Sequence, residues 1–201
     1  NWVYETGGGG WGNSERQYYT NKLSNIAIYG QGKLVITANR IATASSDAVG
    51  TDPDTEQMLY QCSECQFTSA RIKTARKLAF QYGRIEVRAK LDAAHGAWPA
   101  IWMLSEKDIY PNQNNGEMDI MERLNHDGFA YQTTHNHATI TLKQETPKKF
   151  NTGKIDPTGY NTYSVSWYPD KLVYAINGIE TITYPKVADG NTYQWPFNQP
   201  F

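Results

Sequence analysis

The stretch KLVYAINGIETITY, Lys171–Tyr184, joins two runs of β-branched and aromatic residues through Asn177 and Gly178. Asn-Gly is the preferred pair at the centre of a type I′ turn, because both central residues of that turn adopt a positive φ. A two-residue turn of this kind connects antiparallel strands. The segment therefore predicts a β-hairpin.

Other short runs alternate apolar and polar residues in the same way. Lys33–Asn39 (KLVITAN) and Tyr160–Pro169 (YNTYSVSWYP) are predicted strands, and Arg84–Leu91 (RIEVRAKL) sends apolar and charged residues to opposite faces. Two clusters rich in glycine and polar residues, Gly7–Asn13 and Thr43–Gln57, predict surface loops. Helical periodicity is nearly absent and no linker interrupts the chain. The pattern predicts a single all-β domain across all 201 residues, built as an antiparallel sandwich.

Net charge, apolar runs and aromatic content indicate which kinds of binding partner to expect. The chain carries 19 Lys and Arg against 20 Asp and Glu, a formal net charge of −1, so charge gives no reason to expect nucleic acid or an anionic membrane as a partner. No apolar run approaches the roughly 18 residues of a membrane-spanning helix. Aromatic residues make up 13% of the chain; besides filling a core, exposed tryptophan and tyrosine rings offer flat stacking surfaces.

Two cysteines, Cys62 and Cys65, lie close together in QCSECQ. A structural zinc site takes four ligands, and the sequence holds no second cysteine pair. The pattern leaves two alternatives, a local disulfide or two free thiols.

Three carboxylates fall within a short part of Asn114–Asn125 (NNGEMDIMERLN). In a strand, Glu117 and Asp119 point to one face and Glu122 to the other, because successive side chains alternate. A β-bulge, which inserts one extra residue, would return Glu122 to the face of the other two acids. We therefore predict a bulge near Ile120–Met121.

Carboxyls gathered on one face can hydrolyse a glycosidic bond. Two carboxyls about 5–5.5 Å apart suit a retaining mechanism, in which one attacks the anomeric carbon and the other protonates the leaving oxygen and later activates water. Asp119 between the two glutamates would disfavour ionisation of all three groups and so raise at least one pKa. The alternative is a calcium site or a solvated acidic face, although calcium ligands usually come from loops.

Two tryptophans precede the acidic strand in Gly96–Leu104 (GAWPAIWML). An indole plane can stack against the C–H face of a sugar ring. Trp98, beside Gly96 and Pro99, is the better candidate for an exposed platform. Trp102 is a second candidate for binding substrate, although its apolar surroundings equally fit a core position.

Together, the motifs GEMDIME, GAWPAIWML, YGRIEVRAKL and WGNSERQYYT resemble glycoside hydrolase family 16, over Trp2–Phe201 and in the family's order. The resemblance implies a concanavalin-like β-jelly-roll sandwich of two antiparallel sheets, with a substrate cleft on its concave face. It implies Glu117 as the nucleophile, Glu122 as the acid/base and Asp119 as the intervening helper. The extra residue Met121 matches the bulged, laminarinase-like form of the motif.

Three further positions resemble family residues that bind substrate, and each has an ordinary structural alternative. Asn13 resembles a residue that hydrogen-bonds a sugar, and is otherwise a turn asparagine. Arg84 resembles a cleft-facing arginine, and is otherwise a solvated charge on a strand. His135 resembles a cleft histidine near the acid/base; a zinc site formed with His137 would need a third ligand.

The chain also departs from the family pattern. It stops at Gln194–Phe201 (QWPFNQPF), where family members continue with another strand and a closing segment. A sandwich without that strand would expose an unpaired edge, so we expect a separate or cleaved segment to complete it, unless the remainder lies outside this sequence. The family's structural calcium takes a ligand from the closing segment, so we expect no cofactor here, with a structural calcium as the alternative. The continuation Met121–His137 differs from that of laminarinases, which leaves the substrate open.

These features predict a secreted, periplasmic or cell-surface enzyme that acts on a polysaccharide or glycan. The leading prediction is a retaining endo-β-glycosidase that cleaves internal β-1,3 or β-1,4 bonds of a β-glucan, either laminarin or mixed-linkage glucan. One alternative is an endo-β-galactosidase of the same family, acting on a galactan or a mucin-type O-glycan chain. The other is a non-catalytic carbohydrate-binding sandwich, which would have no use for both Glu117 and Glu122.

Overall fold

Strands account for nearly all regular structure in the computed structural model of the chain, which describes residues 2–41 and 62–201. Among those residues the only helix is the short α2 (His137–Ile140), so the predicted all-β class is confirmed. The described residues group into an N-terminal unit, Asn1–Leu78, and a C-terminal unit, Ala79–Phe201. The predicted loop Thr43–Gln57 lies outside the described residues.

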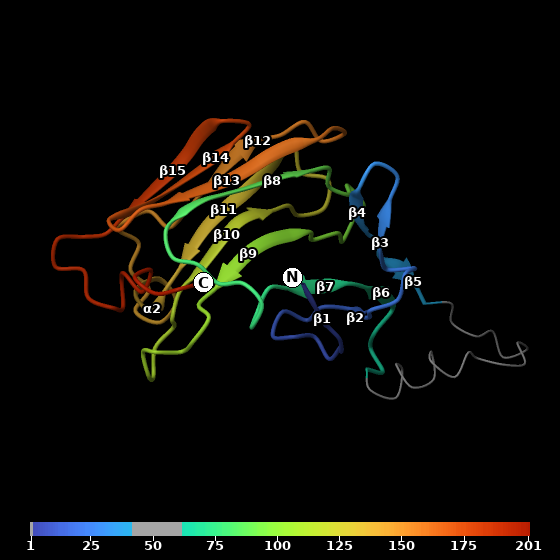
Figure 1. The fold of residues 1–201 in the computed structure, drawn as a ribbon, viewed down its shortest axis with the longest axis horizontal. Coiled ribbons are helices and arrows are strands. Elements are labelled where there is room, and N and C mark those ends of the chain that lie inside the picture. Colours follow the sequence, from blue (N-terminus) through green and yellow to red (C-terminus); the bar gives the residue numbers. More distant parts are fainter. Residues whose placement is uncertain (1, 42–61) are drawn as a thin grey trace, which may run out of the picture. The chain divides into compact units, whose positions relative to one another are not determined.

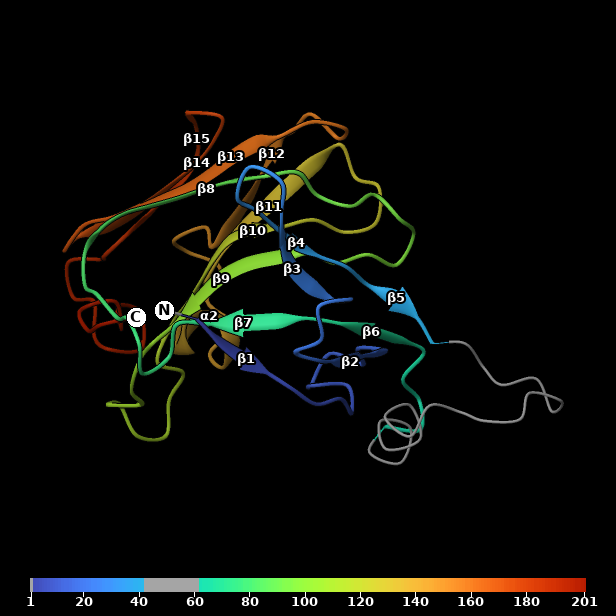
Figure 2. The same cartoon turned by 45° about the vertical axis from the view of Figure 1, so that its right-hand side comes forward.

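The C-terminal unit consists of two four-stranded antiparallel sheets that stack as two layers (Figure 1, Figure 2). The first sheet has the order β12-β11-β10-β9, with strands β9 (Ala100–Leu104), β10 (Glu117–Glu122), β11 (Phe129–His135) and β12 (Phe150–Lys154). The second has the order β15-β14-β13-β8, with strands β8 (Gly83–Ala89), β13 (Asn161–Trp167), β14 (Lys171–Ile176) and β15 (Ile179–Pro185). Contacts of β10 with β13, and of β12 with β15, show that the inner faces of the two sheets pack together.

The described residues of the N-terminal unit, 2–41 and 62–78, form three small sheets. Strand β1 (Val3–Glu5) pairs with β7 (Arg71–Lys73), and β3 (Ile26–Tyr29) pairs with β4 (Lys33–Ile36). The third sheet has the order β2-β6-β5, with strands β2 (Gln17–Tyr19), β5 (Asn39–Arg40) and β6 (Phe67–Ser69). The β2–β6 pairing is parallel, whereas the other pairings of this unit are antiparallel.

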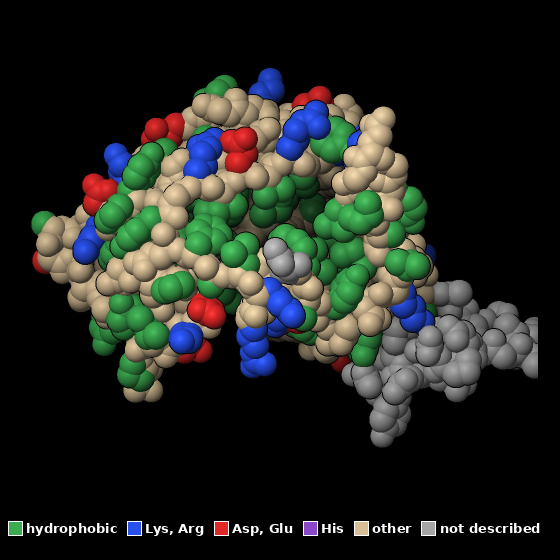
Figure 3. Space-filling model, viewed as in Figure 1, with side chains coloured by type: hydrophobic (Ala, Val, Ile, Leu, Met, Phe, Trp, Pro, Cys, Tyr) green, Lys and Arg blue, Asp and Glu red, His purple; other side chains and the backbone are tan. Residues whose placement is uncertain are grey.

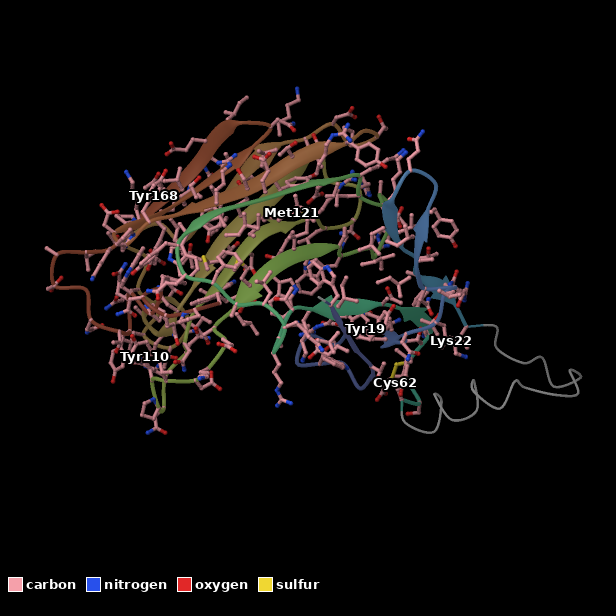
Figure 4. All side chains as sticks on the ribbon, in the orientation of Figure 1. Tyr19, Lys22, Cys62, Tyr110, Met121 and Tyr168 are labelled. Carbon is pink, nitrogen blue, oxygen red and sulfur yellow. A yellow bond between two sulfur atoms is a disulfide. The ribbon has the colours of Figure 1, made fainter. Side chains whose placement is uncertain are left out.

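A local disulfide joins Cys62 and Cys65, which settles the choice between a disulfide and free thiols (Figure 4). Both cysteines are buried, and they pack against the glycine-rich loop: a Cβ added at Gly8 would lie only 2.8 Å from the Cys65 sulfur. Only a residue without a side chain allows this close approach.

The predicted hairpin is confirmed in β14 and β15. Asn177 and Gly178 have φ values of 52° and 78°, and Ile176 pairs directly with Ile179 across the turn. Positive φ at both central residues matches the type I′ geometry that Asn-Gly favours.

Apolar side chains fill the space between the two sheets of the C-terminal unit, and Figure 4 shows the labelled Met121 between the layers. The largest fully buried members are Met118, Ile120, Met121, Tyr163, Trp167, Leu172, Tyr174, Tyr184, Trp195 and Phe197. The outer face of β8 and β13 is polar instead, and Figure 3 shows acidic and basic side chains intermixed over it. This alternation between an apolar inner face and a charged outer face is what the sequence of β8 predicts.

The segment before β10 is fixed by close packing at Gly116. This residue has a φ of +99°, and a Cβ there would lie 2.9–3.0 Å from side-chain atoms of Pro196, Phe197 and Phe201. Gly116→Ala is therefore expected to lower the free energy of unfolding by about 1–3 kcal/mol, from strain and overpacking. Chemical denaturation should detect this loss. Gly128→Ala is the matched control, because nothing lies within 4 Å of the added atom; an equal loss in both variants would contradict the packing argument.

Candidate active site

A β-bulge in β10 brings the three predicted acids to one face of the first sheet. Opposite β11 the register is regular from Glu117 to Asp119 and shifts before Glu122, and opposite β9 it shifts between Asp119 and Met121. The β11 partners of the three acids are His135, Thr133 and Tyr131 in turn. Alternate residues of one strand share a face, so their three partners share it too. The predicted bulge near Ile120–Met121 is confirmed.

The bulge is supported from the core. Ile120 and Met121 are both 1% exposed, so the extra residue adds apolar surface to the interior. The fully buried Gln132 of β11 donates from its amide nitrogen to the Ile120 carbonyl at 2.7 Å. The same nitrogen lies 3.4 Å from the Ser164 carbonyl and 3.3 Å from the Ala175 carbonyl, both in the second sheet. Gln132 thus provides a partner for a carbonyl at the bulge, where the ladder is disrupted.

A cleft of about 270 Å³ crosses the outer face of the first sheet above this bulge. It runs from the loop before β9, across β10 and β11, to the start of β12. Its lining residues are Trp98, Glu122, Leu124, Tyr131, Thr133, His135, Lys149 and Phe150. The mixture of aromatic rings, one carboxyl group and basic side chains suits a polar ring-shaped ligand such as a sugar.

The predicted platform Trp98 lies beside Glu122. Its indole N–H donates to Glu122 Oε1 at 2.9 Å, and 47% of the residue remains exposed. One tryptophan therefore offers an exposed ring to the cleft and also holds a carboxyl group. Trp102 pairs with Asp119 across β9 and β10, so it is half-buried on the face that carries the acids rather than in the core.

Burial and mutual repulsion perturb both glutamates. Burial, followed by the negative charge of Asp119, raises the pKa of Glu117 to about 7. The pKa of Glu122 is also raised, first by burial and then by Asp119, while the hydrogen bond from Trp98 and the charge of His135 oppose the shift. A pair of carboxyls that resists full ionisation near neutral pH can keep one member protonated as an acid.

Asp119 is paired with His135. The His135 Nε2 atom lies 3.1 Å from Asp119 Oδ2, and Asp119 is 4% exposed. This contact raises the pKa of His135, which favours its cationic form. The negative charge of Asp119 in turn raises the pKa values of both glutamates.

The predicted substrate-binding residues Arg84 and Trp102 are not among the residues that line this cleft. Arg84 belongs to β8 in the second sheet, where its guanidinium binds Glu86 and Ser166 on the solvent-exposed face. The expected cleft position of Arg84 is corrected accordingly, and its solvated-charge alternative fits. Asn13 belongs to the N-terminal unit, where its side-chain amide lies 3.4 Å from Glu15 Oε1; its role toward a sugar stays a prediction.

The two neighbouring histidines do not act as a pair. His137 begins α2 and packs against Tyr193 with the two rings tilted and their centroids 4.5 Å apart, whereas His135 faces Asp119. Within residues 2–41 and 62–201, no group of three or more His, Cys, Asp or Glu side chains is arranged to hold a metal ion. Nor does this described part of the chain contain a helix long and apolar enough to cross a membrane.

Comparison of the whole sequence with known proteins assigns the chain to a family. The model of glycosyl hydrolases family 16 matches residues 13–201. The chain belongs to glycosyl hydrolase family 16. A solved family structure, the laminarinase from Rhodothermus marinus, covers 99% of this chain and 75% of its own, with a TM-score of 0.82 and 30% identity. This likeness confirms the predicted jelly-roll sandwich.

Two of the curated relatives illustrate the enzymes that the chain resembles. The β-glucanase of Rhodothermus marinus is 32% identical over 212 residues, which cover 100% of this chain and 66% of that protein. The keratan-sulfate endo-1,4-β-galactosidase of Sphingobacterium multivorum is 35% identical over 134 residues, or 65% of this chain. The first match covers 66% of its relative's length and the second covers 31%. The chain therefore spans less than two thirds of either relative.

Family 16 motifs identified the acids, but several cleft residues were missed. Tyr131 and Thr133 alternate with His135 on β11, so the period of two could have found them once His135 was chosen. Lys149 and Phe150 gave no such signal, because their place in the cleft depends on β12 pairing with β11.

Trp98→Phe is expected to move the alkaline limb of activity to higher pH. Phenylalanine keeps an aromatic face but removes the N–H donor that lowers the pKa of Glu122. A higher pKa keeps Glu122 protonated, and so competent as an acid, to higher pH. The pH profile of kcat/KM measures this shift, and Trp2→Phe, at an exposed position in the N-terminal unit, is the control. An alkaline limb that stays in place or moves down would contradict the role of the indole N–H.

Proposed function

We propose that the chain is a retaining endo-β-glycosidase that cleaves internal β-1,3 or β-1,4 bonds of a β-glucan. The observation that carries the proposal is the bulge that sends Glu117 and Glu122 to the same face of β10. In the proposed reaction Glu117 attacks the anomeric carbon, Glu122 protonates the leaving oxygen and then activates water, and Asp119 maintains the electrostatics of the pair. The names of the Rhodothermus β-glucanase and laminarinase support a β-glucan as the substrate.

An endo mode of attack fits the form of the cleft. The cleft crosses several strands and is lined from Trp98 at one side to Phe150 at the other. Both of these aromatic residues are exposed, at 47% and 43%. Two stacking surfaces that flank the acids can bind sugar units on either side of the bond to be cleaved.

The proposed chemistry needs no cofactor, because the two carboxyls supply both the nucleophile and the proton donor. Activity should therefore survive dialysis against EDTA. An extracellular, periplasmic or cell-surface location is part of the proposal. It is supported by the disulfide between Cys62 and Cys65, since disulfides persist mainly in oxidising compartments.

A second candidate substrate is a β-galactose-containing glycan. The similarity to the keratan-sulfate endo-1,4-β-galactosidase favours it, because that relative has the higher identity of the two curated proteins over the part that it matches. A non-catalytic carbohydrate-binding role is a weaker candidate. Such a role requires the aromatic rings but gives no reason for two glutamates with raised pKa values.

A panel of laminarin, mixed-linkage glucan, agarose, keratan sulfate and mucin-type glycans tests the proposal. Product lengths read by chromatography should show intermediate oligosaccharides early in the reaction with laminarin or mixed-linkage glucan, as endo cleavage requires. NMR of the first products should show the β-anomer before mutarotation. An α-anomer would rule out the retaining mechanism, cleavage of galactans alone would favour the second candidate, and binding without cleavage would favour the non-catalytic role.

A further inference from the structure

We propose that the cleft binds a negatively charged substituent of its glycan, a sulfate ester or a carboxylate, through Lys149. The inference rests on the proposed function in that the cleft holds a β-glycan. It adds a chemical class of substrate, a glycan whose rings carry anionic groups.

Lys149 is fixed in the cleft by its main chain. It directly precedes β12, and its carbonyl accepts a hydrogen bond of 2.8 Å from the Thr134 N–H of β11. This bond extends the β11–β12 ladder by one residue, so the backbone of Lys149 belongs to the wall of the cleft. The residue lines the cleft together with Glu122 and His135.

The Lys149 ammonium group has no partner in the described part of the chain. Residues 2–41 and 62–201 place no carboxylate within ion-pair distance of it, and no other side chain accepts a hydrogen bond from it. The residue is nevertheless half-buried. A partly desolvated cation without a counter-ion is unfavourable, and an anionic ligand at this position would offset that cost.

The charge balance of the cleft permits an anion to enter. His135 lies 3.1 Å from Asp119, so when the imidazole is protonated its charge is paired with that carboxylate. Burial and the charge of Asp119 raise the pKa values of both glutamates, so each is harder to ionise than an ordinary glutamate. The positive charge of Lys149 lines the same cleft, and its field reaches His135, since it lowers the pKa of that residue. Without Lys149, the acids would repel an anionic glycan.

The residues around Lys149 suit a ring that carries a charge. Phe150 follows it in the chain and Tyr131 lines the same cleft, so two aromatic rings accompany one cation. Aromatic faces bind the C–H surface of a sugar ring regardless of its substituents. Lys149 is the cleft group that would distinguish an anionic substituent from a neutral hydroxyl.

The neighbouring Lys148 provides a matched control. It is exposed, does not line the cleft, and donates from Nζ to Asn151 Oδ1 at 3.2 Å. Lys148→Gln and Lys149→Gln make the same chemical change at adjacent positions of one segment. Any general effect of the lower net charge should therefore appear equally in both.

The test compares neutral laminarin, sulfated laminarin and carboxymethylated laminarin as substrates for the unmodified protein and the two variants. For Lys149→Gln, kcat/KM on the anionic polymers relative to neutral laminarin should fall about five- to tenfold at low salt. Lys148→Gln should leave this ratio unchanged. The difference between the variants should shrink at about 0.5 M salt, because salt screens partly exposed charges. A ratio lowered for only one anionic polymer would identify sulfate or carboxylate as the group that is bound.

Affinity electrophoresis of the same proteins in gels containing each polymer keeps the inference separate from the proposed function. If nothing is cleaved, the proposed function fails, yet a retardation by anionic polymers that depends on Lys149 would still uphold the inference. Equal losses of kcat/KM on neutral and anionic polymers would show that the Lys149 ammonium group donates to sugar hydroxyl groups in general. That result would overturn the inference. No difference between the Lys148 and Lys149 variants, in cleavage and in electrophoresis, would also overturn it.

Discussion

Glu117→Gln is expected to lower kcat/KM on the preferred polysaccharide by a factor on the order of 10⁴ or more, because an amide cannot form the covalent glycosyl-enzyme. Binding of the polysaccharide should change little, since glutamine has nearly the same shape and keeps an acceptor oxygen. In the unmodified protein the pKa of Glu117 is raised to about 7 by burial and by Asp119. The kcat/KM should therefore rise with pH through about 7 as the nucleophile ionises.

The same substitution separates lost chemistry from lost folding. The folded state binds the Glu117 proton more tightly than the unfolded state, because the pKa is raised from 4.5 to about 7. The Glu117 contribution to the free energy of unfolding therefore declines as pH rises from about 4.5 through about 7. Glu117→Gln removes this penalty, so denaturation midpoints should show a stabilised variant at pH 8 and little gain at pH 4. An inactive variant that is also destabilised at pH 8 would contradict this account.

Glu122→Gln is expected to lower kcat/KM on the polysaccharide by about 10²–10⁴-fold, the usual contribution of a general acid and base. The alkaline limb of the pH profile should disappear with the group that causes it. Glutamine still offers an oxygen to the Trp98 N–H, so the wall of the cleft should remain intact.

The substrate can distinguish the roles of the two glutamates. An aryl β-glycoside with a good leaving group needs no acid, so Glu122→Gln should form the glycosyl-enzyme from it rapidly and then stall. Azide should restore turnover and give a β-glycosyl azide, because the small anion attacks without a general base. Glu117→Gln should gain nothing from the aryl leaving group. If azide instead gave an α-glycosyl azide with the Glu122 variant, the assignment of nucleophile and acid/base would be reversed.

The features that could be predicted from sequence are set by a few consecutive residues. Asn177 and Gly178 specify the type I′ turn by themselves. Asp119 and Glu122 are three residues apart, so their side chains can point to the same face only if the strand contains a bulge. The charged outer face of β8 likewise follows from a period of two. In each case the physical cause lies within the segment itself.

Other features depend on which strands become neighbours. The period of two correctly places Arg84 on the charged face of β8. The sequence of β8 does not show, however, that this strand belongs to the second sheet, whereas the three acids lie in the first. Trp195 and Phe197 are buried in the core, although nothing in their own segment says which surface they cover. Lys149 reaches the cleft only through the pairing of β11 with β12. Such positions follow from tertiary pairing, which local periodicity does not encode.

The hydrogen bond from Gln132 to the Ile120 carbonyl supports the kinked strand from the interior, on the side away from the cleft. Mutations on the wall of the cleft could therefore change which glycan is accepted while the spacing of the two glutamates is preserved. One set of residues, facing the core, would then determine the reaction chemistry. A separate set, facing solvent, would determine which ligand is bound. Such a division would allow the same fold to accept different polysaccharides without a change in the positions of the two glutamates.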